Sequence, residues 1–122
     1  MILKSNLKMI VKNITKNIIV EDGAELCDGF FSKLIGLMFS VKQKRALIFR
    51  FGREMFISLH MFFVFYPIDV LFLDENKIVV DKKENFKPFA FYKSGKKAMY
   101  AVEMPNGILK KTKTGIGDKI GF

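Results

Sequence analysis

Cysteine and histidine are almost absent from this chain of 122 residues, which contains one of each, Cys27 and His60. A single cysteine excludes an intramolecular disulfide, and a single histidine excludes a metal site built from several Cys or His ligands. A Ser-His-Asp or Cys-His catalytic set would have to use His60. No phosphate-binding glycine loop and no dinucleotide-binding glycine pattern occurs. The sequence therefore predicts neither a metal nor a cofactor.

Long charge-free segments are also scarce. The longest covers residues 55–68, fourteen positions, and it is interrupted by Pro67. A transmembrane helix needs about 20 apolar residues, so this segment suits buried strands better. The N-terminus lacks the basic start and the long apolar segment of a signal peptide, and a lone thiol fits a reducing compartment. We therefore expect a cytoplasmic protein that does not enter the membrane.

Hydrophobic residues make up 50% of the chain, and fourteen residues are phenylalanine, which excludes a disordered polypeptide. This length and composition predict a single domain spanning residues 1–122. The phenylalanines at 62–65 are expected in the core, because base stacking would require exposed rings.

The formal net charge of +9 is spread along the chain, with basic clusters at 42–45, 93–97 and 110–113. If these clusters shared a face, they would suit nucleic-acid phosphates; otherwise they are solvated loops around the core. The chain has only three arginines, which disfavours sequence-specific base recognition.

Short segments rich in β-branched and aromatic residues recur along the chain and end at Gly, Pro, Asn or Asp. One main helix is expected after Asp28, which can cap its N-terminus, and before Gly36, which can end it; Cys27 would lie on its buried face. A short helical turn is expected at 108–111. The pattern predicts a mainly β (α+β) fold, a small closed barrel or sandwich of about eight short strands with one main helix. Strands are expected at 8–14, 17–20, 46–51, 56–65, 68–73, 78–80, 98–104 and 119–122.

Two of these strands have apolar residues on both faces, and each carries one acidic residue. Asp69 lies at the start of 68–73, and Glu103 lies near the end of 98–104. If the two strands are antiparallel neighbours, the carboxylates would share one rim of the sheet. Two close carboxylates can act as general acid and base. Alternatively, each accepts backbone N–H hydrogen bonds or pairs with a lysine.

Three segments resemble the signature of domain-of-unknown-function family 192, also called uncharacterised protein family 0127. They are Gly-Leu-Met-Phe at 36–39, Pro-Ile-Asp-Val-Leu-Phe-Leu-Asp at 67–74, and Val-Glu-Met-Pro-Asn-Gly at 102–107, which is followed by Gly117 and Asp118. Their order and spacing match from about residue 20 to the end of the chain. The resemblance implies a small β-barrel or sandwich with flanking helices, and it implies no activity, because the family is itself of unknown function.

The chain departs from this family in two places. Many members carry Trp-Met-Lys-Asn before the proline, where this chain has His60, Met61, Phe62 and Phe63. An arginine that often precedes the Gly-Leu-Met element is replaced by Lys33 or is absent. Both changes remove polar groups that relatives carry.

The sequence favours a non-enzymatic binding domain that takes a small molecule or a protein segment at the rim of the sheet. The candidate ligand-binding residues are Asp69, Glu103, Asn106 and His60, although His60 also fits a hydrogen-bonded histidine of the core or rim. Two alternatives stay open: a non-specific nucleic-acid-binding protein that uses the lysine clusters, and a carboxylate-dependent hydrolase. No catalytic residues are assigned.

Overall fold

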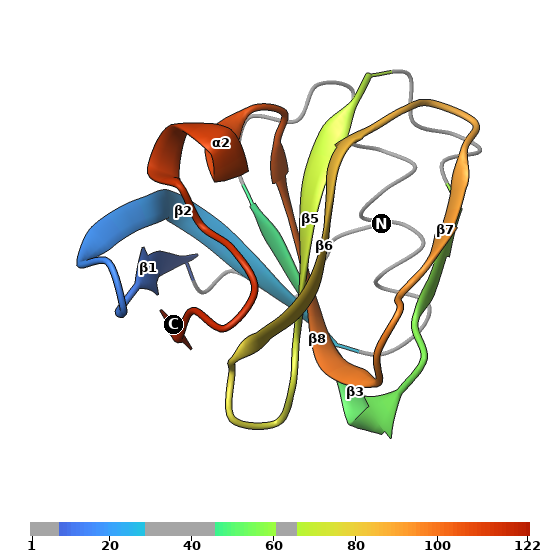
Figure 1. Cartoon of the computed structure of the whole chain (residues 1–122), viewed down its shortest axis with the longest axis horizontal. Helices are drawn as coiled ribbons and strands as arrows, with labels where there is room; N and C mark the ends of the chain where they lie inside the picture. The colour runs from blue at the N-terminus through green and yellow to red at the C-terminus, as the bar shows by residue number, and fades with distance from the viewer. Residues whose placement is uncertain (1–7, 29–45, 61–65) are drawn as a thin grey trace.

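The computed structural model of the chain describes residues 8–28, 46–60 and 66–122. This part contains a seven-stranded sheet, a separate two-stranded sheet and one short helix (Figure 1). The mainly β class predicted from the sequence is confirmed. The elements are β1 (Lys8–Asn13), β2 (Ile18–Asp28), β3 (Leu47–Met55), β4 (Ser58–His60), β5 (Ile68–Leu73), β6 (Val79–Phe86), β7 (Phe91–Lys93), β8 (Ala98–Pro105), α2 (Ile108–Thr112) and β9 (Ile120–Gly121).

The seven-stranded sheet has the order β6-β5-β8-β3-β2-β1-β9 and curls into a half-barrel. Its neighbouring strands are antiparallel except for β2 and β3, which are parallel. The two edges meet at one point, where Ile78 forms a bridge with Lys119. The N–H of Val79 donates to the carbonyl of Asp118 there, at 2.9 Å. The curl therefore encloses one face of the sheet.

Each face of the sheet packs into its own hydrophobic cluster. The inner cluster joins the two edge strands, through Val79 of β6 and Ile120 of β9, with Val102 and Met104 of β8, and it includes Leu109 of α2. The outer cluster lies between the sheet and the β4–β7 pair. All six residues of β5 are buried, because its two faces contribute to different clusters. The outer cluster comprises Leu47, Phe49, Ile57, Ile68, Val70, Phe72, Phe86, Ala98 and Ala101.

The prediction that Cys27 lies on a helix is wrong, because Cys27 belongs to strand β2. The strand expected at 17–20 is longer than the sequence predicts, because β2 continues to Asp28. Its last residues pair in parallel with β3, Cys27 opposite Phe49. This pairing satisfies the backbone of Leu26, Cys27 and Asp28, so tertiary contacts override the local helical spacing. The rest of the predicted helix, 29–36, lies outside the described residues.

Other boundaries agree with the sequence to different degrees. The strands expected at 68–73 and 98–104 are present, and so is the helical turn after residue 107. Strand β6 runs to Phe86, further than expected, because β5 pairs with it along its length. Strand β4 covers only 58–60 of the expected 56–65, and 61–65 lie outside the described residues. In the part of the chain that is described, no helix has the length and hydrophobicity to cross a membrane.

Candidate binding site at the end of strands β5 and β8

Strands β5 and β8 are antiparallel neighbours, as predicted, and they bring both acidic residues to one end of the sheet. Asp69 lies opposite Met104, and Glu103 lies opposite Val70. Directly opposed residues share a face of a sheet and successive residues alternate. Asp69 therefore belongs to the inner face and Glu103 to the outer face. The two acids share one end of the sheet, as predicted, but their side chains lie on opposite faces, so they cannot act together as acid and base on one bond.

The carboxylate of Asp69 is buried and fully used by the fold. Its Oδ1 accepts a hydrogen bond from the backbone N–H of Asn85 at 3.0 Å, and its Oδ2 accepts from Gly107 and Leu109, each at 3.0 Å. The last two N–H groups belong to the start of α2, which has no partner for them within the helix. Asn85 has a φ of 52° and Gly107 a φ of 95°, so the carboxylate binds the N–H groups of two residues whose backbone is left-handed. Asp69 thus attaches the start of α2 and the end of β6 to the first residues of β5.

The carboxyl group of Glu103 differs from that of Asp69 in its hydrogen bonding. Glu103 is 1% exposed, and its Oε1 has no hydrogen-bond partner within the described part of the chain. The residues directly opposite on β3 and β5 are Leu47 and Val70, both buried. Burial raises the pKa of Glu103 from 4.5 to about 8, because the apolar surroundings disfavour the charged form. At neutral pH the carboxyl group is therefore mostly protonated and able to donate a hydrogen bond.

Glu103 lies in the middle of a row of residues that crosses five strands on the outer face. Glu25 is opposite Leu47 at one end of the row, and Lys83 is opposite Val70 at the other. Adjacent strands are about 4.8 Å apart, so these two charged residues flank Glu103 at backbone distances of about 10 Å. A hydrophobic residue separates Glu103 from each of them. The row therefore buries one neutral carboxyl group between two hydrophobic residues.

The other two candidates, Asn106 and His60, lie on different elements of the fold. Asn106 is exposed in the turn that joins β8 to α2. Pro105 pairs with Ile68, which places this turn beside the start of β5. His60 ends β4 opposite Phe91 and so belongs to the two-stranded sheet. Among Asp69, Glu103 and Asn106, Glu103 alone combines burial with an unpartnered polar atom in the described part of the chain.

Sequence reasoning missed the polar link that attaches β7 to the sheet, because no strand was expected at 91–93. The hydroxyl of Tyr92 donates to Oδ2 of Asp81 at 2.7 Å, and the N–H of Gly95 donates to the same oxygen at 2.8 Å. The hydrogen bond to Asp81, with burial and the nearby charge, raises the pKa of Tyr92 to about 12. The Tyr92 ring lies 5.7 Å from Phe72 and 6.2 Å from Phe86, centroid to centroid. The alternation of inward Ala90 and Tyr92 with outward Phe91 was the available signal.

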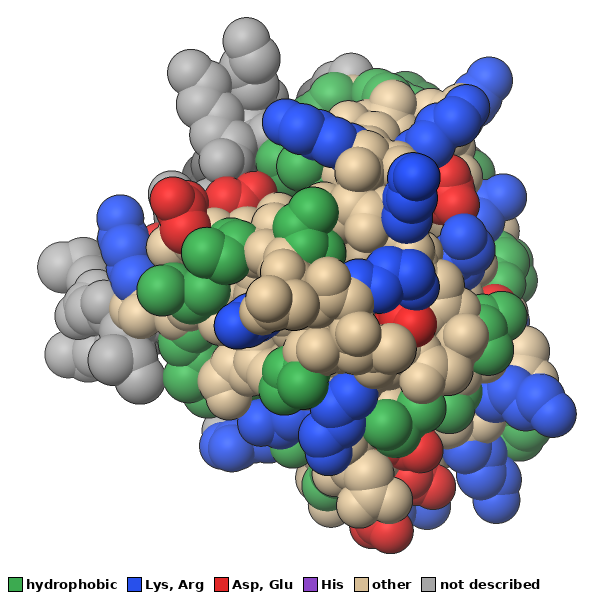
Figure 2. All heavy atoms as spheres, turned by 60° about the vertical axis from the view of Figure 1, so that its left-hand side comes forward, with side chains coloured by type: hydrophobic (Ala, Val, Ile, Leu, Met, Phe, Trp, Pro, Cys, Tyr) green, Lys and Arg blue, Asp and Glu red, His purple; other side chains and the backbone are tan. Residues whose placement is uncertain are grey.

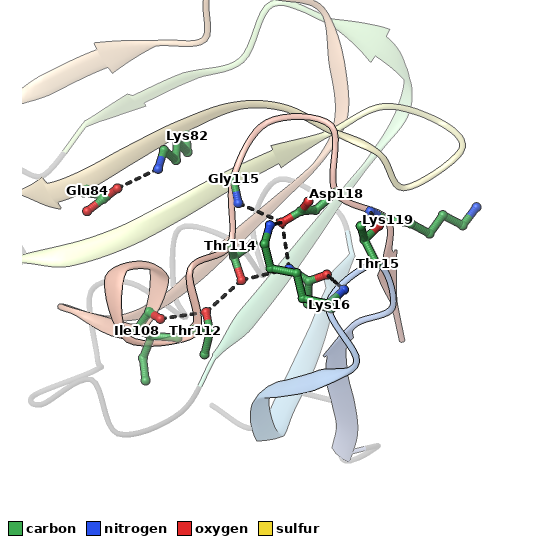
Figure 3. A network of polar contacts seen from close by, with 11 residues as sticks. Thr15, Lys16, Lys82, Glu84, Ile108, Thr112, Thr114, Gly115, Asp118 and Lys119 are labelled. Atoms are coloured by element: carbon green, nitrogen blue, oxygen red, sulfur yellow. Dashed lines mark hydrogen bonds and ion pairs between the residues drawn. The ribbon is translucent and has the colours of Figure 1, made fainter.

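A second polar network joins β1 to the C-terminal turn (Figure 3). The side-chain amide of Asn13 donates to Oδ2 of Asp118 at 2.9 Å and to the hydroxyl of Thr114 at 3.1 Å. Lys16 and the N–H of Gly115 bind the same oxygen of Asp118, at 2.6 and 3.0 Å. Burial alone would raise the pKa of Asp118, but these hydrogen bonds hold it below its usual value of 3.8. The polar groups satisfy one another, so this network is structural.

The basic clusters do not form one surface in the described part of the chain. The cluster at 93–97 precedes the first residue of β8, and the cluster at 110–113 follows its last residue. Eight residues of strand separate them by about 25 Å. On the face seen in Figure 2, lysine side chains stand apart with hydrophobic and acidic side chains between them. The third cluster, 42–45, lies outside the described residues.

The half-barrel fold, with its Pro67–Asp74 and Val102–Gly107 segments side by side at one end, agrees with the family resemblance of the sequence. The model of the family DUF192, described as Uncharacterized ACR, matches residues 11–122, and the chain belongs to this family. Among its relatives is UPF0127 protein PH1112 of Pyrococcus horikoshii, 38% identical over 113 residues, which cover 91% of this chain and 96% of the relative. UPF0127 protein PF1050 of Pyrococcus furiosus is 37% identical over 110 residues, covering 88% and 93%.

Two crystal structures share the fold. A protein from Sinorhizobium meliloti, described provisionally as a transcription regulator, superposes with a TM-score of 0.84 at 24% identity and covers 96% of this chain and 95% of its own. A protein of unknown function from Novosphingobium aromaticivorans superposes with a TM-score of 0.81 at 18% identity, covering 95% and 84%. At these identities the likeness concerns the fold alone.

Proposed function

We propose that this protein is a non-enzymatic binding domain and that the carboxyl group of Glu103 recognises its ligand. The observation that supports the proposal is the burial of Glu103 with its Oε1 unpartnered among the described residues. A buried polar atom without a partner costs about 1–3 kcal/mol, so such atoms are rare in the interior of folded proteins. Asp69, by contrast, has three hydrogen-bond donors and needs no ligand.

The chemistry of a protonated carboxyl group narrows the class of ligand. Such a group offers one O–H donor and one carbonyl acceptor side by side. A primary amide offers the complementary N–H and C=O, so the two groups can form a pair of parallel hydrogen bonds. Leu47 and Val70, on either side of Glu103, suit an apolar body. The favoured ligand is a primary amide on an apolar body, as a free small molecule or as the Asn or Gln side chain of a protein segment.

Titration of the ¹⁵N-labelled full chain with hexanamide, followed by NMR at pH 7, tests this proposal. Hexanamide should shift the backbone signals of Leu47, Val70 and Glu103, and the shifts should weaken as the pH rises above about 8, where the carboxyl group ionises. Glu103→Leu should abolish them. Glu84→Gln, a change at an exposed acid of β6, is the matched control and should preserve them. Equal shifts in Glu103→Leu, or none in the unaltered protein, would refute the proposal.

A further inference from the structure

Three exposed isoleucines lie on the strand pair β1–β2 and its turn. Ile10 is 55% exposed, Ile14 51% and Ile19 53%. Isoleucine is usually buried, and exposed apolar side chains gathered in one region are typical of an interaction surface. Strands β1 and β2 lie at the left of Figure 1, whereas β7, which belongs to the pair that covers the outer cluster, lies at the right. We call the surface formed by Ile10, Ile14 and Ile19 the isoleucine face.

The strand register shows that these side chains share the outer side of the half-barrel. Val11 is buried in the inner cluster, so its neighbours Ile10 and Lys12 point to the outer side. Ile19 of β2 lies directly opposite Lys12 and therefore shares that side.

Ile14 extends the isoleucine face over β9. Gly121 of β9 lies opposite Lys12 and is therefore also on the outer side. A Cβ atom at Gly121 would come within 2.8 Å of Cδ1 of Ile14, so the Ile14 side chain lies across this glycine. The absence of a side chain at Gly121 thus lets the apolar surface continue from one strand to the next.

Charge is divided between the two strands that carry this face. Strand β1 contains two lysines, Lys8 and Lys12, and no acidic residue, whereas β2 contains four acidic residues and no basic one. Lys8, Lys12 and Asp22 are exposed. The pairing shifts by one residue at Ile10, which falls opposite Asp22 and Gly23. Asp22 is therefore level with Ile10, midway between the two lysines.

A surface of this pattern is complementary to a copy of itself. Stacked sheets lie about 10 Å apart with their side chains interdigitated. A twofold axis that runs parallel to the strands, between β1 and β2, places β1 of each copy over β2 of the other. Asp22 of one copy then faces Lys8 and Lys12 of the other, and Ile10 of one copy packs beside Ile19 of the other. We propose that the isoleucine face binds a second copy of this chain.

The division of charge also argues against other arrangements and partners. A twofold axis perpendicular to the strands would place β1 over β1 and β2 over β2, where like charges repel. An anionic membrane attracts exposed apolar side chains beside lysines, but the acidic residues of β2 would meet the same headgroups. A second copy matches both charges, so membrane binding becomes an outcome to be distinguished.

Sedimentation equilibrium of the full chain measures the association. Stable complexes bury about 800 Å² on each partner, more than three half-exposed isoleucines offer, so the dimer should be weak and form between about 10 and 500 µM chain. Ile10→Thr combined with Ile19→Thr should weaken it at least about 10-fold, because apolar area is lost from four side chains of the dimer while the strand propensity is kept.

The matched control is Ile116→Thr, the same change at a position that is 66% exposed. Ile116 precedes Gly117, whose N–H donates to the carbonyl of Val79 on β6, so it lies away from the isoleucine face. This variant should dimerise like the unaltered protein. A chain that stays monomeric throughout the concentration range would refute the proposal, and so would monomers that bind vesicles of phosphatidylcholine and phosphatidylserine. Dimers that the paired isoleucine changes leave intact would also overturn it.

Exchange of charges tests the orientation of the two copies. Lys8→Glu combined with Lys12→Glu makes both strands acidic, and Asp22→Lys places a base among the acids of β2, so each variant alone should associate several-fold more weakly. A mixture of the two should associate more tightly than either alone, because opposite charges then meet at both contacts. Both variants keep a positive net charge, since that of the chain is +9, so overall attraction does not explain such a gain. A mixture no tighter than its components would contradict the proposed orientation.

Discussion

The buried carboxyl group of Glu103 should make the stability of this protein depend on pH in an unusual direction. Its pKa is raised from 4.5 to about 8 by burial. Between these two values the folded chain holds a proton that the unfolded chain releases, so the free energy of unfolding falls as the pH rises. The contribution is complete below about pH 4.5 and is lost as the pH passes about 8. Most buried carboxylates that form ion pairs act in the opposite sense.

The size of the effect follows from the same two pKa values. At about 1.36 kcal/mol for each pH unit, the full difference corresponds to about 5 kcal/mol. About 3–4 kcal/mol of this should be lost between pH 5 and pH 8, the range most easily measured. The charged residues in the same row, Glu25 and Lys83, are each separated from Glu103 by a hydrophobic residue, so neither replaces the missing partner.

Urea denaturation at pH 5, 6, 7 and 8 measures this loss. Glu103→Gln removes the titrating group, and its free energy of unfolding should change by about 3–4 kcal/mol less over the range than that of the unaltered protein. The comparison concerns slopes, so any constant destabilisation by the buried amide cancels. Glu84→Gln, at an exposed position, should keep the slope of the unaltered protein. Identical slopes for the unaltered protein and Glu103→Gln would show that the carboxyl group is ionised in the folded state, contrary to our reasoning.

Two further changes probe the polar contacts that hold the fold. Asp69→Asn should lower the free energy of unfolding, measured by urea denaturation, by about 2 kcal/mol. The carboxylate accepts three N–H groups on its two oxygens, and an amide has only one oxygen to accept them. Unchanged stability would contradict the anchoring role of Asp69. Tyr92→Phe should lower the free energy of unfolding by about 1 kcal/mol. It should also remove from the ultraviolet titration the tyrosine whose pKa is about 12. Titration of all tyrosines near pH 10 in the unaltered protein would contradict the hydrogen bond to Asp81.

The acidic pair illustrates how far the sequence alone leads at this site. The apolar composition of 68–73 and 98–104 was enough to predict two buried strands and to place Asp69 and Glu103 at one end of them. The face on which each side chain lies depends on the register between the strands, and a shift of one residue moves a side chain to the other face. Nothing local to either strand fixes that register. Which of the two acids would lack partners was therefore beyond sequence reasoning.

The wrong placement of Cys27 on a helix has a related cause. Leu26, Cys27 and Asp28 have the spacing and the capping residue of a helix, but their backbone pairs with β3, about twenty residues further along the chain. A parallel partner leaves no turn signal beside the strand, whereas the Asp and Asn residues at 74–77 mark the hairpin that joins β5 to β6. The predictions were therefore better for contacts between neighbouring segments than for distant ones.

The closure of the half-barrel has a kinetic consequence. Strand β1 pairs with β9, and Asn13 hydrogen-bonds to Thr114, 101 residues away in sequence. Contacts of this separation give a high contact order, which is typical of domains that fold in milliseconds to seconds rather than microseconds. During synthesis, β1 and β2 leave the ribosome long before β9 can pair with them. Exposed Ile10 and Ile19 and the open edge of β1 are therefore accessible to other chains during that interval, when intermolecular strand pairing is the chief hazard.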